Sequence, residues 1–290
     1  MTVVPGVALE RRAPRSVRRR RRLVAIADHS LLIAAAIAFA APDAFIVLTS
    51  LMTTDQALST RLWPEPFHWS NYSEVFKQAP ILRYALNTTL YAVGATALML
   101  VSSIPVAYAL ARLRWKGRDA VFLLVLVAMM LPPQVTIVPL YVMWAKLNLV
   151  GTLWPIILPN LFGDAFSIFL LRQFFLTIPE SYLDAARVDG CGELRILVSV
   201  VCRLAKPAIA AVALFMFLFC FSDFFGPLLY SGDESNWTLS VGLAQFRTLH
   251  QVQWNLTMAA TVMVLAPVIV LFFFAQKAFV EGVTLTGVKE

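Results

Sequence analysis

The chain has 290 residues, of which 59% are hydrophobic and only 14% are charged, and its mean hydropathy is +0.74. This balance is far from that of soluble globular domains and excludes a large soluble enzyme domain. The formal net charge of +7 would suit a nucleic-acid-binding protein, but eight of the 24 basic residues form one N-terminal run. We therefore expect a single membrane domain surrounded by lipid, and no nucleic-acid partner.

The N-terminal run of arginines lies between positions 11 and 22, directly before the first apolar stretch. Such a run is typical of the cytoplasmic flank of a membrane-spanning helix, so residues 1–30 are predicted to form a cytoplasmic Arg-rich tail. A cleavable signal peptide is the alternative, because small residues follow the apolar run at positions 38–40. The apolar character resumes over residues 44–52, which gives the length of a span and favours retention of the segment.

Six apolar stretches approach the roughly 20 residues that a spanning helix needs. They cover residues 31–49, 84–111, 120–144, 153–175, 207–229 and 257–275. The pattern predicts an all-α integral membrane protein with six transmembrane helices in a domain of residues 31–281, followed by a cytoplasmic tail of residues 282–290. The two tails and the connections on their side hold 19 of the 24 basic residues. Both termini are therefore predicted to be cytoplasmic.

Three carboxylates lie at membrane depth, at Asp43, Asp164 and Asp223. Ionisable groups there are costly and often mark a transport path, although each could also satisfy backbone groups freed by a helix break. A break is expected at Pro42, directly before Asp43. The Leu-Pro-Pro-Gln run that ends at Gln134 should also break or kink the third span, either to expose carbonyls to a cavity or simply for packing.

The longest cytoplasmic connection, residues 176–206 between the fourth and fifth spans, contains a short predicted helix. Pro179 lies near its first position, Glu180 is in its first turn, and Gly190 ends it. A second helical run follows, with an apolar stripe that must face lipid headgroups or protein. The stripe consists of Leu194, Leu197, Val201 and Leu204.

The middle of the first loop helix has little side-chain bulk, because Ala185 and Ala186 occupy it. Asp184 and Asp189 flank these alanines with negative charge. Another protein surface could therefore approach the helix backbone closely, and we predict a docking site there. A hairpin that merely connects two spans is the simpler alternative.

Residues 184–190 resemble the cytoplasmic EAA loop of ABC importer permeases, whose pattern is approximately E-A-A-x-x-x-G. Other matching stretches begin at Asn71, Asn87, Ala107 and Leu131, and with the ending 282–289 they carry the similarity over nearly everything after the arginine tail. The chain thus resembles the MalG-like permeases of carbohydrate-uptake ABC importers. It departs from the family pattern at Asp184, where glutamate is usual, and at Arg203, where many relatives have proline.

The resemblance implies the permease subunit of an ATP-driven sugar importer in a prokaryotic cell membrane. The implied partners are a second, similar permease, a dimer of ATP-binding subunits and an extracytoplasmic sugar-binding protein. ATP and Mg would be bound by the partners, and this chain, which lacks a G-x-x-x-x-G-K-[ST] loop, would bind no cofactor and would not be an enzyme. The residues implied to contact the ATPase are Glu180, Asp184, Ala185, Ala186, Asp189 and Gly190.

The substrate path has its own candidates, and two of them rest on the resemblance as well. Residues 221–228 are similar to the family stretch W-N-D-F-x-x-P-L, which draws attention to Asp223 and Phe224. The full set of path candidates is Asp223, Phe224, Asn87, Gln134, Asp43 and Asp164. No catalytic or metal site is predicted, and an ion-coupled secondary transporter stays open as the alternative because it too uses broken helices and intramembrane carboxylates. The sequence does not identify the sugar.

Overall fold

The computed structural model describes residues 15–244 and 253–287, and within these ranges the chain contains helices and turns but no strand. The predicted tail residues 1–14 and 288–290 lie outside the described residues. The elements are α1 (Arg15–Ser50), α2 (Thr54–Ala57), α3 (Ser70–Gln78), α4 (Ile81–Arg112), α5 (Arg118–Met130), η1 (Pro133–Thr136), α6 (Ile137–Lys146), α7 (Trp154–Ile157), η2 (Leu158–Phe162), α8 (Ala165–Thr177), α9 (Glu180–Val188), α10 (Glu193–Ile196), η3 (Leu197–Val201), α11 (Cys202–Leu204), α12 (Lys206–Ser222), α13 (Phe225–Tyr230), η4 (Glu234–Asn236), α14 (Leu239–Ala244) and α15 (Trp254–Gly287). The all-α class expected from the sequence is confirmed.

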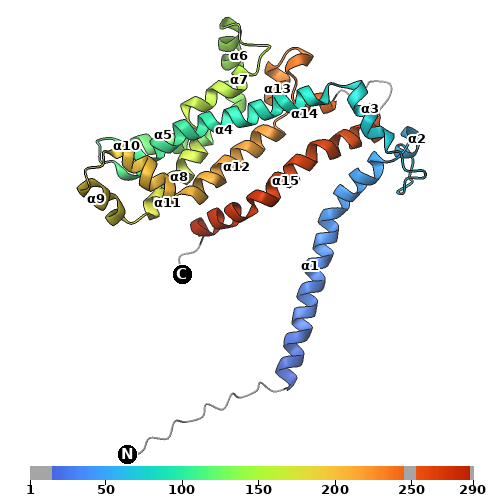
Figure 1. Ribbon diagram of the computed structural model, residues 1–290, viewed down its shortest axis with the longest axis horizontal. Coiled ribbons are helices and arrows are strands. Elements are labelled where there is room, and N and C mark those ends of the chain that lie inside the picture. Colours follow the sequence, from blue (N-terminus) through green and yellow to red (C-terminus); the bar gives the residue numbers. More distant parts are fainter. Residues whose placement is uncertain (1–14, 245–252, 288–290) are drawn as a thin grey trace, which may run out of the picture.

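Helix α4 is the centre of the bundle and packs against both α8 and α12 (Figure 1). Its buried face carries small residues, among them Ala92, Ala95 and Ala107, which are completely buried. Small side chains let neighbouring backbones approach closely, and dispersion contacts and hydrogen bonds then hold helices together in lipid. The sequence of α4 therefore places it inside a bundle rather than at its lipid-facing edge.

Two buried clusters lie along α4. One gathers around Tyr84 and Tyr91 and includes residues of α3, α13, α14 and α15. The other surrounds Leu110 and Phe175 and takes in Leu183 and Ala186 of α9. The connection between α8 and α12 is thus part of the second core, and it lies at the opposite end of the bundle from α3 and α14 (Figure 1).

Three helical segments are long and apolar enough to cross a membrane, namely 26–50, 81–112 and 154–177. The number rises to five if each of two sharply bent helix pairs counts as one span, and a shorter apolar helix covers 254–270. All six predicted apolar stretches are helical for most of their length. Length alone gives three fewer spans than predicted. Two of the stretches are interrupted, residues 120–144 between α5 and α6 and residues 207–229 between α12 and α13, and the apolar part of α15 covers only residues 254–270.

The Pro-Pro-Gln run breaks the third predicted span as expected. Helix α5 ends at Met130, Pro132 is extended with ψ 132°, and the axes of the two flanking helices differ by 87°. A proline cannot donate its backbone N–H and disfavours helix in the residue before it, which explains the break.

The break expected at Pro42 is wrong. Helix α1 runs without interruption from Arg15 to Ser50, with Pro42 in its interior. One proline removes a single helical hydrogen bond, whereas a full break in an isolated segment would leave several backbone groups without partners, so the helix continues. α1 extends away from the other helices and contacts them chiefly through α15 (Figure 1).

Candidate functional site

The loop between α8 and α12 folds into a short helical hairpin of α9, α10, η3 and α11 at one end of the bundle (Figure 1). We call residues 179–204 the loop hairpin. Its inner face is apolar: Leu183 and Ile196 are completely buried, and Ala186 is 9% exposed. These side chains belong to the second buried cluster, which holds the loop hairpin to the spans.

Helix α9 begins and ends where the sequence predicted. Pro179 is the residue before its first turn, and Gly190 follows its end with φ +78°. The amide of Gly190 donates to the carbonyl of Arg187, and that of Cys191 donates to the carbonyl of Ala186, both at 3.0 Å. This pair of bonds is the Schellman arrangement, in which a glycine adopts the left-handed conformation that other residues rarely adopt.

Five of the six predicted contact residues lie on the outer side of the loop hairpin. Ala185, Asp189 and Gly190 are exposed, and the side chains of Glu180 and Asp184 are 53% and 61% exposed. Ala186 instead faces the core. Its small size serves the approach of α9 to the spans, not the approach of a partner to α9.

Hydrogen bonds between polar and charged side chains connect the loop hairpin to α4. The hydroxyl of Tyr108 on α4 donates to one oxygen of Glu193 at 2.5 Å, and the other oxygen of Glu193 accepts from Arg187 Nε at 3.0 Å. Arg187 also donates to Asp184 at 2.9 Å. These hydrogen bonds hold the pKa of Glu193 below its ordinary value, because Tyr108 first and Arg187 second favour the carboxylate form.

A second connection runs from the end of α4 to the joint between α8 and α9. The Arg112 side chain is 8% exposed, and it donates to the carbonyl oxygen of Phe175, with 2.9 Å for Nε, and to that of Ile178. Arg112 Nη1 also lies 3.8 Å from Glu180 Oε2. The guanidinium thus donates to two carbonyls at the end of α8, of which that of Phe175 also accepts from the amide of Ile178 at 3.2 Å.

Sequence reasoning missed these connections. Arg112 entered the prediction as a cytoplasmic charge and as the end of the matching stretch that begins at Ala107, and Tyr108 only as part of that stretch. Their spacing of four residues near the end of a span was the available signal, since it places both side chains on one face of α4.

The apolar stripe predicted for the second loop helix is only partly correct. Leu197 and Val201 are buried, whereas Leu194 is 75% and Leu204 43% exposed. A π-helical turn over η3 changes the register of the residues that follow it, which accounts for the exposure of Leu204, whereas Leu194 lies before the turn. The exposed apolar residues of the loop hairpin are Tyr182, Val188, Leu194, Val198 and Leu204.

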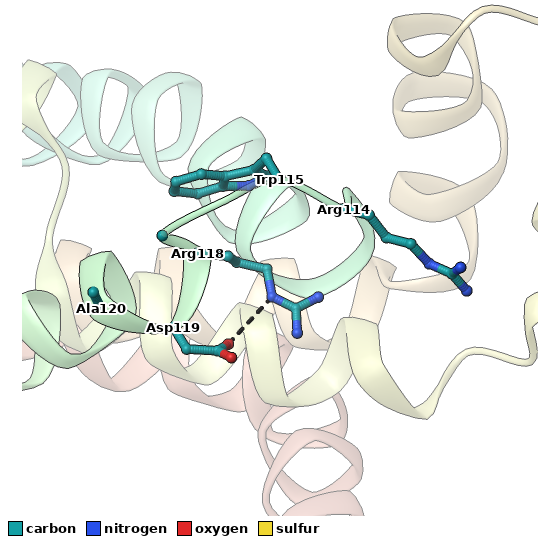
Figure 2. A pocket seen from close by; sticks show the side chains of 6 residues that line it. Arg114, Trp115, Arg118, Asp119 and Ala120 are labelled. Carbon is teal, nitrogen blue, oxygen red and sulfur yellow. Dashed lines mark hydrogen bonds and ion pairs between the residues drawn. The ribbon is translucent and has the colours of Figure 1, made fainter.

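The turn between α4 and α5 forms a neighbouring basic corner. A hollow of about 420 Å³ lies there, lined by Arg114, Trp115 and Arg118 among others. Figure 2 shows Arg118 turned toward Asp119, with which it forms an ion pair at 3.3 Å, while Arg114 points away from them. This end of the bundle is therefore basic as well as partly apolar.

Two of the predicted path residues are occupied by bonds within the chain. Asp223 lies at the break between α12 and α13, where it accepts from the Tyr91 hydroxyl at 2.9 Å and from the amide of Gly226 at 3.1 Å. Asn87 donates its side-chain N–H groups to the carbonyls of Ser235 and Trp237, each at 2.9 Å. Both residues fix the backbone around helix ends.

Asp164 is the N-cap of α8 and accepts from the amide of Ser167 at 2.7 Å. It also lines a cavity of about 380 Å³ between α8 and α12. The other three path candidates, Gln134, Asp43 and Phe224, are exposed at the α5–α6 break, on α1 and before α13. The structure therefore does not bring the six predicted path residues into one site.

Comparisons with known proteins place these features in context. A family model described as "Binding-protein-dependent transport system inner membrane component" matches residues 103–285. The arabinooligosaccharides transport system permease protein of Halalkalibacterium halodurans is 34% identical over 227 residues, which cover 78% of this chain and 81% of that protein. The diacetylchitobiose uptake system permease protein of Streptomyces coelicolor is 30% identical, covering 91% of this chain and 88% of its own length.

Two further proteins agree with these matches. The sn-glycerol-3-phosphate transport system permease protein of Yersinia pestis is 33% identical, covering 76% of this chain and 81% of that protein. A crystal structure of a bacterial ABC transporter involved in the import of the acidic polysaccharide alginate contains a chain with a TM-score of 0.79 and 26% identity. The similarity covers 90% of this chain and 98% of that one.

Proposed function

Because the chain belongs to the family of binding-protein-dependent transport system inner membrane components, we propose that it is the permease subunit of an ATP-driven carbohydrate importer. The family is a membrane component and not a catalytic enzyme, so the expectation that this chain is not an enzyme is confirmed. The comparisons give no support to the ion-coupled alternative. The observation that carries the proposal is the loop hairpin, which is exposed on its outer side and fixed to α4 and α8 on its inner side.

The proposed topology has six spans, formed by α1, α4, α5 with α6, α7 with α8, α12 and α15. Both termini would be cytoplasmic, on the side of the loop hairpin and the α4–α5 corner. The distribution of basic residues supports this orientation, because cytoplasmic segments collect Lys and Arg. The domain limits follow from it: a tail of residues 1–30, a permease domain of residues 31–281 and a tail of residues 282–290.

The proposed partners are a second permease, a dimer of ATP-binding subunits that hold ATP and Mg, and an extracytoplasmic sugar-binding protein, in a prokaryotic cell membrane. The relatives support this assembly, since they are named as parts of transport or uptake systems. Their names also suggest the substrate class, which would be an oligosaccharide or a polyol phosphate.

We propose that the outer face of the loop hairpin is the surface that the ATP-binding subunit contacts. Glu180, Asp184, Asp189 and the backbone near Ala185 and Gly190 would form its polar part, and the five exposed apolar side chains its apolar part. When the ATP-binding dimer closes, movement of α9 would pass to α4 through the Tyr108–Glu193–Arg187 bonds and to α8 through Arg112. Both helices would then move as rigid elements with the loop hairpin.

Val188 offers the sharpest test of the coupling surface, because it is 89% exposed and makes no contribution to the core. In Val188→Glu, ATP-dependent uptake by reconstituted complexes should fall about tenfold or more, since an unpaired charge in an apolar contact is costly. Co-purification with the ATP-binding subunit should fall in parallel. The measurement is uptake of labelled sugar into liposomes loaded with ATP.

Leu62→Glu is the matched control, because Leu62 is 70% exposed in the loop before α3, at the opposite end of the bundle. This variant should retain its association with the ATP-binding subunit. If Val188→Glu inserts normally and takes up sugar like the wild type, the loop hairpin is not the coupling surface.

A further inference from the structure

The cavity between α8 and α12 lies about half-way along the 154–177 span, and no residue on it has a role in the loop hairpin. Its volume of about 380 Å³ is within the range of small-ligand sites. The residues that matter for its chemistry are Asn160, Asp164, Phe166 and Phe219.

One wall of the cavity is held rigidly to α4. Ser102 donates to the carbonyl of Asn160 at 3.0 Å, and the amide of Asp164 donates to Ser103 at 3.1 Å. Gly163 allows the turn between them with φ +89°, and a Cβ there would lie 3.1 Å from Ile168. The polar groups of the cavity are therefore fixed before any ligand arrives.

Two oxygen acceptors on this wall have capacity to spare. Asp164 uses Oδ2 to cap α8, while Oδ1 accepts no hydrogen bond from any residue that the structure describes. Asn160 directs its amide N–H groups to the carbonyls of Ile156 and Ile157, both at 3.0 Å, and its Oδ1 is likewise left without a donor among the described residues. Acceptors at membrane depth require donors, and a lipid chain has none.

The lining of the cavity also includes aromatic side chains, Phe166 from α8 and Phe219 from α12. Phe219 is 65% exposed and Phe166 is 44% exposed, and the ring of Phe166 is supported edge-on by Phe215 at 6.1 Å between centroids. A sugar ring has an apolar face of C–H groups that suits an aromatic ring, and hydroxyl donors around its rim. The cavity thus offers aromatic rings for the apolar face of a sugar and oxygen acceptors for its hydroxyl groups.

We propose that this cavity is a contact site for a sugar ring during its passage, with Asp164 and Asn160 accepting hydroxyl hydrogens and with Phe166 covering the apolar face. Phe219, which is 65% exposed, lies beside the bound ring and is not required for its binding. The inference rests on the proposed function, because it takes carbohydrate as the cargo. It assigns to this subunit a direct part in handling the sugar.

Labelling of a cysteine at the cavity tests the proposal in the assembled transporter. Phe219→Cys is introduced into a chain that carries Cys191→Ser, Cys202→Ser and Cys220→Ala. Phe39→Cys in the same background is the matched control, because Phe39 is 83% exposed on α1. Labelling by a membrane-permeant maleimide is followed with and without arabinotriose, diacetylchitobiose or sn-glycerol 3-phosphate.

A sugar that the wild type imports should slow labelling at position 219 about threefold or more, since a bound ligand covers the groups that it touches. It should leave position 39 unchanged. Equal labelling with and without the imported sugar would overturn the proposal. The proposal would also be overturned if the cysteine at position 219 were unreactive in the complex both with and without sugar. That result would assign the cavity to the contact with the second permease.

Asp164→Asn provides a second, independent readout. Asparagine is as good an N-cap as aspartate, so α8 should stay capped while the charge is lost. Sugar import should fall about tenfold while ATP hydrolysis continues, because a hydrogen bond to a charged acceptor is lost only from the sugar. An equal fall in both rates would indicate a structural role and contradict the inference.

A failure of the proposed function would look different. A wild-type complex that imports its sugar without ATP refutes the ATP-driven importer and the sugar site with it, whereas ATP-dependent import without protection of position 219 refutes the sugar site alone.

Discussion

Single residues at the breaks of this bundle serve the backbone first. Asp164, Asp223 and Asn87 each bond to backbone groups that a helix end leaves without partners. This explains how polar side chains persist at membrane depth, because their cost is offset by the backbone groups that they satisfy. Among these three, Asp164 also lines the cavity between α8 and α12, and our proposal of a sugar contact rests on this combination.

Gly190 has a conformational role that can be tested separately from contact with a partner. Its φ of +78° is unfavourable for other residues, and no atom lies within 4 Å of a Cβ placed there. Gly190→Ala should therefore reduce the stability of the loop hairpin by about 1 kcal/mol, through backbone strain alone. Hydrogen exchange of the amides of α9 would measure this loss.

Gly192→Ser is the control for that measurement. Gly192 has φ −72° and ψ 158°, is the N-cap of α10 and has open space around it. Serine suits an N-cap position, so the protection of the α9 amides from hydrogen exchange should be unchanged or slightly higher. Equal loss of protection in both variants would show that the conformation of Gly190 is not what matters.

At the scale of elements, the loop hairpin packs together with the spans. α9 shares a buried cluster with α4, α8 and α12, and two sets of polar bonds reinforce it. The sharp bend of 83° between the end of the loop hairpin and α12 lets the hairpin lie across the end of the bundle. We therefore expect a movement of α9 to be transmitted to several spans together.

Arg112 is the element-scale connection with the clearest consequence. In Arg112→Met, the carbonyls of Phe175 and Ile178 lose a charged donor in a nearly buried position, and the free energy of unfolding should fall by about 2 kcal/mol. The free energy of unfolding of Arg112→Lys should lie between those of the wild type and Arg112→Met, because an ammonium group keeps the charge but lacks the planar fork of the guanidinium. Thermal unfolding of the purified complex measures both.

The control is Arg114→Met, since Arg114 is exposed and points away from its neighbours in Figure 2. The midpoint temperature of thermal unfolding of Arg114→Met should equal that of the wild type. If Arg112→Met unfolds at the wild-type temperature as well, the connection between α4 and the α8–α9 joint carries no stability.

At the scale of the whole molecule, the proposed orientation makes a prediction about sidedness. A fluorescent protein fused after Glu290 should fold and fluoresce in the cytoplasm. Cysteine placed at Leu62 should react with a membrane-impermeant maleimide added from outside intact cells, because the loop before α3 lies at the end opposite to the loop hairpin (Figure 1). Cysteine placed at Val188 should react only after permeabilisation, and the reverse pattern would contradict the topology.

The sequence by itself determined the helical class, the family and the boundaries of α9, because apolar length, basic residues and helix-end signals act locally along the chain. It also placed the break before Gln134. Only the tertiary structure decided that Ala186 faces inward, that a π-helical turn divides the apolar stripe, and that Arg112 and Tyr108 tie the loop hairpin to α4. These outcomes depend on side chains that meet across different helices, and a linear pattern does not specify which faces meet. For the same reason the cavity at Asp164 became visible only when α8 and α12 were seen packed together.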